Sequence, residues 1–348
     1  MSTENKLIKP LSSIRFFAAL FVLLSHLGFL SNTNISFFMI NEGFIGVTLF
    51  FILSGFILSY SYQDRLSNKT ISISEFYIAR IARIYPLHII TLLISIHFFT
   101  INITGITIFL SNILLLQAFI PHPDYYFSLN APSWSISVEM FFYLLFPLFI
   151  KLNNRTLLLL SFTIIFVKII IAIFSDELQH AMLYISPLLR LPDFLIGILI
   201  YRLRKNYPLE LPRHTTNILQ FTSIIILFVF VFMSDKINIA HRYDIYYIIP
   251  MGLIIFSLSF NSGVIADILS YRTIVYLGEA SFSLYMTHQL IIRYLVEINE
   301  KYNILPIVYF FIFVILTCII TSLLFYKFIE KPIKKIFFQK MISISQKK

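Results

Sequence analysis

The sequence predicts an all-α polytopic membrane protein with about ten transmembrane helices, one re-entrant or interfacial helix, and both termini in the cytoplasm. Composition is the first reason: 58% of the 348 residues are hydrophobic, 13% are charged, and the mean hydropathy is +0.84. A soluble protein of this length needs more polar surface than that. The other two reasons are apolar runs of bilayer length and an uneven distribution of lysine and arginine between the loops.

Ten apolar runs, separated by polar breaks, are predicted to cross the membrane. A span needs about 20 predominantly apolar residues, because an α-helix rises about 1.5 Å per residue across a hydrocarbon core about 30 Å thick. The runs cover residues 12–30, 43–61, 84–101, 134–150, 156–174, 187–203, 216–234, 245–260, 274–296 and 304–326.

An eleventh apolar run, residues 105–120, is assigned by charge. If it does not fully cross and the N-terminus is cytoplasmic, 20 lysines and arginines of the loops and tail lie inside and 3 lie outside. If it crosses, 14 of those 20 move outside. Because cytoplasmic loops carry an excess of basic residues, we expect 105–120 to be the re-entrant or interfacial helix, on the outer side.

The domain bounds, the net charge and the cysteine content exclude further classes of protein and partner. We expect one membrane domain over residues 1–335 and a basic cytoplasmic tail over residues 336–348. The basic stretch from Lys327 to Lys348, which includes this tail, is expected to bind anionic membrane lipid. The net charge of +10 is explained by cytoplasmic loops, so no nucleic-acid partner is predicted. The single cysteine, Cys318, excludes an internal disulfide. No cleavable signal peptide and no metal site are predicted.

The first run contains two residues that are costly inside a membrane, Arg15 and His26. They are eleven residues apart, about three helical turns, so they lie on nearly the same helix face and about 16 Å apart along the axis. This face is predicted to hold a fixed cation near the cytoplasmic surface and a proton-exchanging imidazole deep in the membrane. A structural histidine bonded to a backbone carbonyl is the alternative for His26.

Two further polar residues are predicted at the depth of His26. Counting from the span ends places His26 and His288 about 21 Å from the cytoplasmic edge, and Glu139 about 22 Å from it. Glu139 is therefore predicted to orient or polarise the imidazole of His26. The alternatives are a structural salt bridge for Glu139 and local hydrogen bonds for His288.

A cluster of arginines is predicted at the cytoplasmic edge. Arg80 and Arg83 are three residues apart, so they share one helix face just before the third span. Together with Arg15 they suit a phosphate group, because each guanidinium donates paired hydrogen bonds to its oxygens. Plain cytoplasmic-loop cations are the alternative. Elsewhere, Arg190 and Asp193 are expected to pair with each other, and Lys168 has no assigned partner.

These residues belong to a series of motifs that resembles the integral membrane acyltransferases of family 3. The likeness covers most of the chain, and its motifs occur in the family's order. Thr48 departs from a common family form, which has an acidic residue there, so it is assigned no role. The matching pieces are Arg15 with His26, GFIGVTLFFILSGFILS at 43–59, Arg80-x-x-Arg83 followed by Ile84-Tyr85-Pro86, SWSISVE at 133–139, RLPDFLIG at 190–197, GEASFSLYMTHQ at 278–289 and FIEKP at 328–332.

The resemblance implies an activity: transfer of an acyl group, usually acetyl from acetyl-CoA, to a hydroxyl of a cell-surface carbohydrate. The acceptor would be O-antigen, capsule, exopolysaccharide or a lipid-linked glycan, and the location the bacterial inner membrane. It also implies that Arg15, His26, Arg80 and Arg83 are needed, and Tyr85 belongs to the same motif. Some family members carry an extracytoplasmic hydrolase-like domain. We expect this chain to be the stand-alone form.

The two lines of reasoning combine into one hypothesis for the mechanism. The CoA phosphates dock on the arginines and the pantetheine arm points toward His26. His26 acts either as general base on the acceptor hydroxyl or as a transient acyl carrier. Trp134 and Ser135 either mark the outer interface or, with His288, line the acceptor entrance.

Two other functions share the span count and the buried charges. One is a transporter or flippase of lipid-linked sugars, and the other is a membrane polysaccharide polymerase. Transporters often show paired repeats and broken helices at corresponding positions, and a polymerase is expected to have a large outer loop. The sequence shows neither feature clearly, which favours the acyltransferase.

Overall fold

The computed structural model describes residues 7–27, 42–99, 103–174, 179–208, 210–302 and 304–336. Every regular element in these ranges is helical. The ends of two predicted spans, 28–30 and 100–101, and residues 337–348 of the predicted tail lie outside the described residues.

Each of the ten apolar runs corresponds to a helix, and the run 274–296 is divided into two helices at Ala280. The placement of the helices is thus confirmed. Their bounds are α1 Lys9–Ser25, α3 Ile45–Leu58, α5 Ile73–Ser95, α8 Ser133–Phe149, α9 Asn154–Phe174, α10 Leu191–Asn206, α11 Arg213–Met233, α13 Ile245–Leu258, α15 Arg272–Glu279, α16 Ser281–Tyr302 and α17 Ile307–Phe325.

Among the described helices, five are long and apolar enough to cross a membrane by themselves: Ile45–Ser67, Ile73–Phe98, Asn154–Phe174, Arg213–Lys236 and Ile307–Ile336. The first and last of these include π-helical turns, η2 Ser59–Gln63 and η7 Tyr326–Glu330. The described part of the chain is therefore all-helical and has helices suited to span a membrane, while ten crossings and cytoplasmic termini stay predictions.

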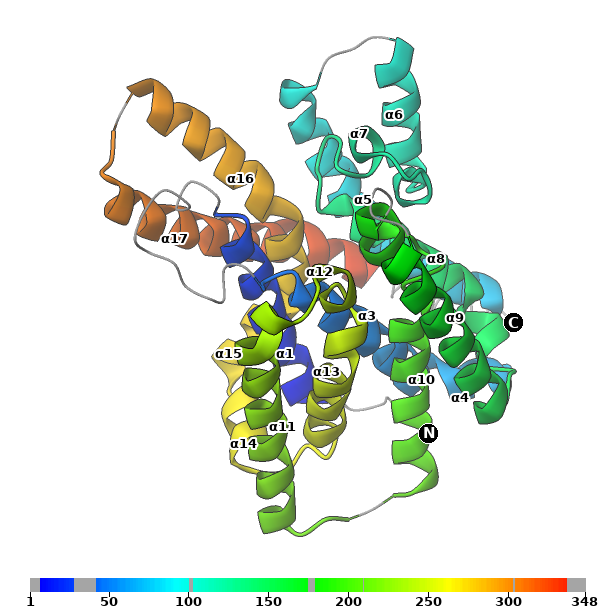
Figure 1. The fold of residues 1–348 in the computed structure, drawn as a ribbon. Helices are drawn as coiled ribbons and strands as arrows, with labels where there is room; N and C mark the ends of the chain where they lie inside the picture. The colour runs from blue at the N-terminus through cyan, green and yellow to red at the C-terminus, as the bar shows by residue number, and fades with distance from the viewer. Residues whose placement is uncertain are drawn as a thin grey trace.

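The run 105–120 forms a short helix, α6 Ile103–Ile113, followed by a 3₁₀ turn over Gln117–Phe119 and the short helix α7 Pro123–Tyr126. With 11 residues, α6 is about 16 Å long, about half the thickness of the hydrocarbon core. It ends before Leu115, which has a φ of 56°. As described, α6 is one of the shorter apolar helices, and the re-entrant or interfacial placement of 105–120 stays a prediction. Figure 1 shows α6 and α7 together at one end of the molecule.

Helix α1 lies at the centre of the molecule and packs against α3, α13, α15 and α16 (Figure 1). Glycines allow the closest crossings. A Cβ on Gly278, at the end of α15, would lie 2.1 Å from the carbonyl oxygen of Ser12 in α1. Helices α3 and α10 cross equally closely, because a Cβ on Gly55 would lie 2.0 Å from the carbonyl oxygen of Phe194. Such small residues let backbones approach in membrane proteins.

A Gly55→Ala variant is expected to lower the free energy of unfolding by about 1–3 kcal/mol, the usual cost of overpacking a tight interior. The added methyl group would meet backbone atoms, which cannot rotate away. Thermal unfolding of the detergent-purified protein measures the effect. Gly252→Ala in α13 is the matched control, because its nearest neighbour would be the flexible end of Ile200 at 3.4 Å. Equal melting temperatures for the two variants would contradict the prediction.

Candidate active site

His26 follows the last residue of α1 and meets His288 of α16. Nδ1 of His26 lies 2.8 Å from the carbonyl oxygen of Val22 and 3.3 Å from Nε2 of His288. The two ring centroids are 5.0 Å apart. His288 therefore lies at the level of His26, as the depth count predicted, and the two side chains are in contact.

The protons on the two rings follow from these contacts. A carbonyl oxygen can only accept, so His288 Nδ1, which lies 2.7 Å from the carbonyl oxygen of Tyr285, carries the proton. Nε2 of neutral His288 then accepts from Nδ1 of His26, which also donates to Val22. Nε2 of His26 keeps its lone pair and has no hydrogen-bond partner within the described ranges. This nitrogen is available as a base or a nucleophile.

Glu139 of α8 does not contact His26. Its Oε1 accepts hydrogen bonds from Ser54 at 3.0 Å and from Tyr143 at 2.5 Å. It also lies close enough to Arg15 and Arg83 for their charges to interact. The predicted pairing of Glu139 with His26 is thus wrong: His288 takes that place, and Glu139 lies on the arginine side. Depth counted along separate spans is uncertain by about a turn, which is enough to exchange one neighbour for another.

The predicted arginine cluster lines a cavity of about 400 Å³, which we call the basic chamber. Its walls come from the starts of α1 and α5, the break between α15 and α16, and the turn η7. Helix α5 begins with a capping box, in which Ser72 and Glu75 satisfy each other's backbone N–H groups. The chamber is strongly basic: it holds two carboxylates, Glu279 and Glu330, and five cations, Arg15, Arg65, Arg80, Arg83 and Lys334.

The three predicted arginines differ in their partners. Arg80 is buried, donates to the hydroxyl of Tyr62 at 2.6 Å and lies 4.7 Å from the centre of that ring. Arg15 and Arg83 make no hydrogen bond or ion pair with any described residue, although both line the chamber. Guanidinium groups without a protein acceptor are available to an anionic ligand.

A narrower cavity of about 50 Å³, the inner slot, adjoins the basic chamber. Arg15, Arg83, Ser281 and Phe282 line both cavities, so the two lie side by side. The slot is otherwise mostly apolar, and its polar lining includes Ser54, Glu139, Ser135 and Tyr285. The ring of Tyr285 lies 5.8 Å from the ring of His288. The slot therefore reaches Tyr285, the neighbour of His288, whereas His26 and His288 themselves line neither of these two cavities.

The remaining predicted site residues fall in different places. Ser135 lines the slot and lies 2.7 Å from the hydroxyl of Tyr285. Trp134 is buried against Phe51 and Tyr184 and lines neither cavity. Tyr85 also lies outside both cavities and meets the ring of His88 edge-on. Within the described part of the chain, no three His, Cys, Asp or Glu side chains could hold a metal ion together.

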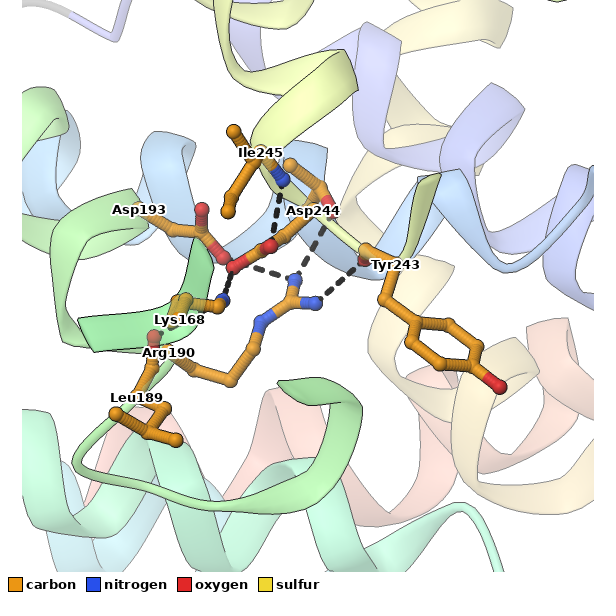
Figure 2. A network of polar contacts seen from close by, with 8 residues as sticks. Lys168, Leu189, Arg190, Asp193, Tyr243, Asp244 and Ile245 are labelled. Atoms are coloured by element: carbon orange, nitrogen blue, oxygen red, sulfur yellow. Dashed lines mark hydrogen bonds and ion pairs between the residues drawn. The ribbon is translucent and has the colours of Figure 1, made fainter. Parts of the chain in front are cut away.

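Four fully buried charges form a separate network (Figure 2). Arg190 and Asp193 pair at 2.8 Å, as predicted. Lys168 forms an ion pair with Asp244, the residue before α13, which sequence reasoning missed. The sequence places Lys168 within a span and Asp244 just before another, 76 residues away, so no local signal joins them.

The network also gives a place to Thr48, the residue without an assigned role. Arg190 donates to the hydroxyl of Thr48 at 2.9 Å and to the carbonyl oxygen of Tyr243 at 2.7 Å. Arg190 thereby joins α3 to the segment before α13 and to the start of α10. This is a structural function, because none of these residues lines the chamber or the slot.

A family comparison decides the class of protein. The family model described as an acyltransferase domain matches residues 11–326. This chain belongs to acyltransferase family 3. The acyltransferase motifs are therefore correctly identified, and the chain is an enzyme of this class. No solved structure matches this acyltransferase at a significant level.

Curated relatives of this acyltransferase are moderately similar over most of its length. "Acyltransferase MdmB" of Streptomyces mycarofaciens is 27% identical over 330 residues, which are 82% of this chain and 79% of the relative. "Putative peptidoglycan O-acetyltransferase YrhL" of Bacillus subtilis is 26% identical over 364 residues, 95% of this chain and 55% of the relative. "Putative O-acetyltransferase SACOL0978" of Staphylococcus aureus is 25% identical over 360 residues, 95% of this chain and 58% of that protein. The chain thus spans little more than half the length of the latter two.

Proposed function

We propose that this acyltransferase moves an acetyl group from cytoplasmic acetyl-CoA to a hydroxyl of a cell-surface carbohydrate, in the bacterial inner membrane. One observation carries the proposal: Arg15 and Arg83, which make no hydrogen bond or ion pair with any described residue, line both the basic chamber and the inner slot, and the slot reaches Tyr285, the neighbour of His288. The names of the relatives, which include O-acetyltransferases, support the same reaction.

The shape and charge of the cavities suit an acyl-CoA donor. The diphosphate of CoA carries negative charge at one end of a long, thin pantetheine arm. Arg15 and Arg83, at the junction of chamber and slot, are placed to bind that diphosphate. The arm would then lie in the slot, whose apolar lining includes Val47, Phe50 and Ile136. Its thioester would approach Tyr285 and the histidines beyond it.

His26 supplies the chemistry through Nε2, by one of two routes. As general base, it takes the proton of the acceptor hydroxyl while that oxygen attacks the acetyl carbonyl carbon; the C–S bond breaks, and the thiolate of CoA receives the proton. As acyl carrier, Nε2 itself attacks that carbon and the C–S bond breaks, so that CoA leaves as its thiolate; the acceptor hydroxyl then attacks the acetyl carbon, the N–C bond breaks, and the proton of the hydroxyl passes to the thiolate. In both routes Nε2 becomes positively charged, and the hydrogen bonds from Nδ1 to Val22 and His288 stabilise that charge.

Acetyl-CoA is expected to raise the melting temperature of the purified acyltransferase, because a ligand that binds only the folded state adds about 2.7 kcal/mol at 100 times its dissociation constant. Arg15→Gln and Arg83→Gln are expected to lose most of this shift, since each removes a partner of the diphosphate. Arg155→Gln is the matched control: Arg155 is exposed at the start of α9 and lines neither cavity. No effect of CoA on the wild-type protein would favour a transporter instead.

The acceptor is identified by chemical analysis of the cell-surface glycan. Glycan from cells with and without the gene is compared before and after mild alkaline hydrolysis, which removes esters. Loss of one acetyl ester in the deletion strain, restored by the wild-type gene, supports the proposal. An unchanged ester content, with protein present in the membrane, contradicts the carbohydrate acceptor.

A further inference from the structure

The C-terminal FIEKP motif builds one wall of the basic chamber. Its first residues belong to the π-helical turn η7, which follows α17. Two hydrogen bonds hold this turn against the break between α15 and α16. The hydroxyl of Tyr326 donates to Glu279 at 2.6 Å, and the hydroxyl of Ser283 donates to Glu330. Single π-helical turns are rare and occur frequently at functional sites.

The turn places one lysine of the basic C-terminal region at the chamber. Lys334 lines the chamber and forms an ion pair with Glu330 at 3.1 Å. The carboxylate of Glu330 is almost completely buried, whereas 42% of the Lys334 side chain is exposed. The ammonium group is thus held by Glu330 and lies 5.4 Å from the centre of the Tyr326 ring, while part of the side chain stays exposed. Of the four lysines described between residues 327 and 335, it is the one that lines the chamber.

The order of the cations along the cavities indicates which phosphate meets which residue. Arg15 and Arg83 line the chamber and the slot, whereas Lys334 lines the chamber alone, as Arg65 and Arg80 do. Of these three cations, Arg80 already donates to the hydroxyl of Tyr62. In CoA the diphosphate is attached to the pantetheine arm, and the 3′-phosphate is on the ribose, farther from the thioester. A donor whose arm occupies the slot therefore presents its diphosphate to the arginines and its 3′-phosphate to the outer part of the chamber.

We propose that Lys334, held by Glu330 at the turn η7, binds the 3′-phosphate of acetyl-CoA and makes the enzyme select this donor over its dephospho form. The inference rests on the proposed function and deepens it. It assigns a specificity-determining role to a residue that the sequence places in a lipid-binding basic region. A compact ammonium group with three donors is well suited to a phosphate.

The test compares two donors and two variants of the full chain in detergent. Acetyl-CoA and acetyl-dephospho-CoA differ only in the 3′-phosphate, and binding is measured by the ligand-dependent shift in melting temperature. The wild-type protein is expected to bind acetyl-CoA at least about tenfold more tightly, which corresponds to about 1.4 kcal/mol. Lys334→Gln is expected to lose about tenfold in affinity for acetyl-CoA and none for acetyl-dephospho-CoA, which removes the preference.

Lys335→Gln is the matched control, because Lys335 is exposed, adjacent in sequence and absent from the chamber wall. It is expected to keep the wild-type preference, and Lys334→Arg is expected to keep it in part. If Lys334→Gln retains the full preference, the inference is wrong although the proposed function stands. If the wild-type protein binds neither donor, the proposed function itself fails. A Lys334→Gln protein that weakens both donors equally would also overturn the inference, since that result indicates general damage to the chamber.

Discussion

A His26→Ala variant is expected to lose acetyl transfer by about 100- to 10,000-fold, the usual contribution of general acid–base catalysis. The side chain lies at the end of α1 and supplies Nε2 as the available basic atom, because Nδ1 is committed to Val22 and His288. Radiolabelled acetyl-CoA and membranes that contain the acceptor measure the rate. Binding of acetyl-CoA should change little, since the arginines that would hold its phosphates are unaltered.

The control for this experiment is His214→Ala. His214 is exposed at the start of α11 and lines neither cavity, so the rate is expected to stay at the wild-type value. His288→Ala is expected to have a smaller effect than His26→Ala, because it removes the group that accepts from Nδ1 and leaves Nε2 in place. A His26→Ala protein that is folded and transfers acetyl at the wild-type rate would remove His26 from the mechanism.

The same assay without acceptor separates the two chemical routes. An acyl carrier would accumulate acetyl-His26, which a rapid quench traps as protein-bound label. Direct transfer leaves the wild-type protein unlabelled. Either result is informative, because His26→Ala provides the unlabelled reference.

The second large effect concerns stability. Lys168→Met is expected to lower the free energy of unfolding by about 3–5 kcal/mol, the usual cost of removing one partner from a buried ion pair. Both Lys168 and Asp244 are without exposed surface, so the variant would leave a carboxylate buried beside Asp193, the other carboxylate of the network. Thermal unfolding in detergent measures the loss.

Two variants test whether the loss of stability in Lys168→Met comes from breaking a buried ion pair. Lys205→Met breaks a Lys–Asp pair whose members are 42% and 53% exposed, and it is expected to cost about 0–1 kcal/mol, since solvent screens such pairs. The double variant Lys168→Met with Asp244→Asn removes both charges and is expected to recover much of the lost stability. If Lys168→Met were no more harmful than Lys205→Met, the pair would not be a structural element of the interior.

Much of the fold could be predicted because hydropathy and helical spacing are local properties. Each of the ten apolar runs corresponds to a helix, and the run 105–120 includes the short helix α6. The three-residue spacing of Arg80 and Arg83 places both on the chamber wall. The pair formed by Arg190 and Asp193 was predictable for the same reason, because its members lie on one helix face.

Contacts between helices were not predictable in the same way. Depth counting placed His26, His288 and Glu139 at one level. Because α16 packs on α1, His288 is the residue that contacts the imidazole of His26. Glu139 of α8 instead lies near the arginines. Lys168 and Asp244 are 76 residues apart, so nothing local joins them.

The sequence by itself determined the class of protein, its helices and its family, since composition, periodicity and motif order express them directly; the residues proposed to carry the chemistry came from the same motifs. The tertiary structure decided which of these residues meet. It places His288 beside His26, sets the chamber next to the slot, and positions Lys334 of the basic C-terminal region on the chamber wall. The physical reason is that crossing angles and a single π-helical turn set these contacts, and both depend on packing between segments far apart in the chain.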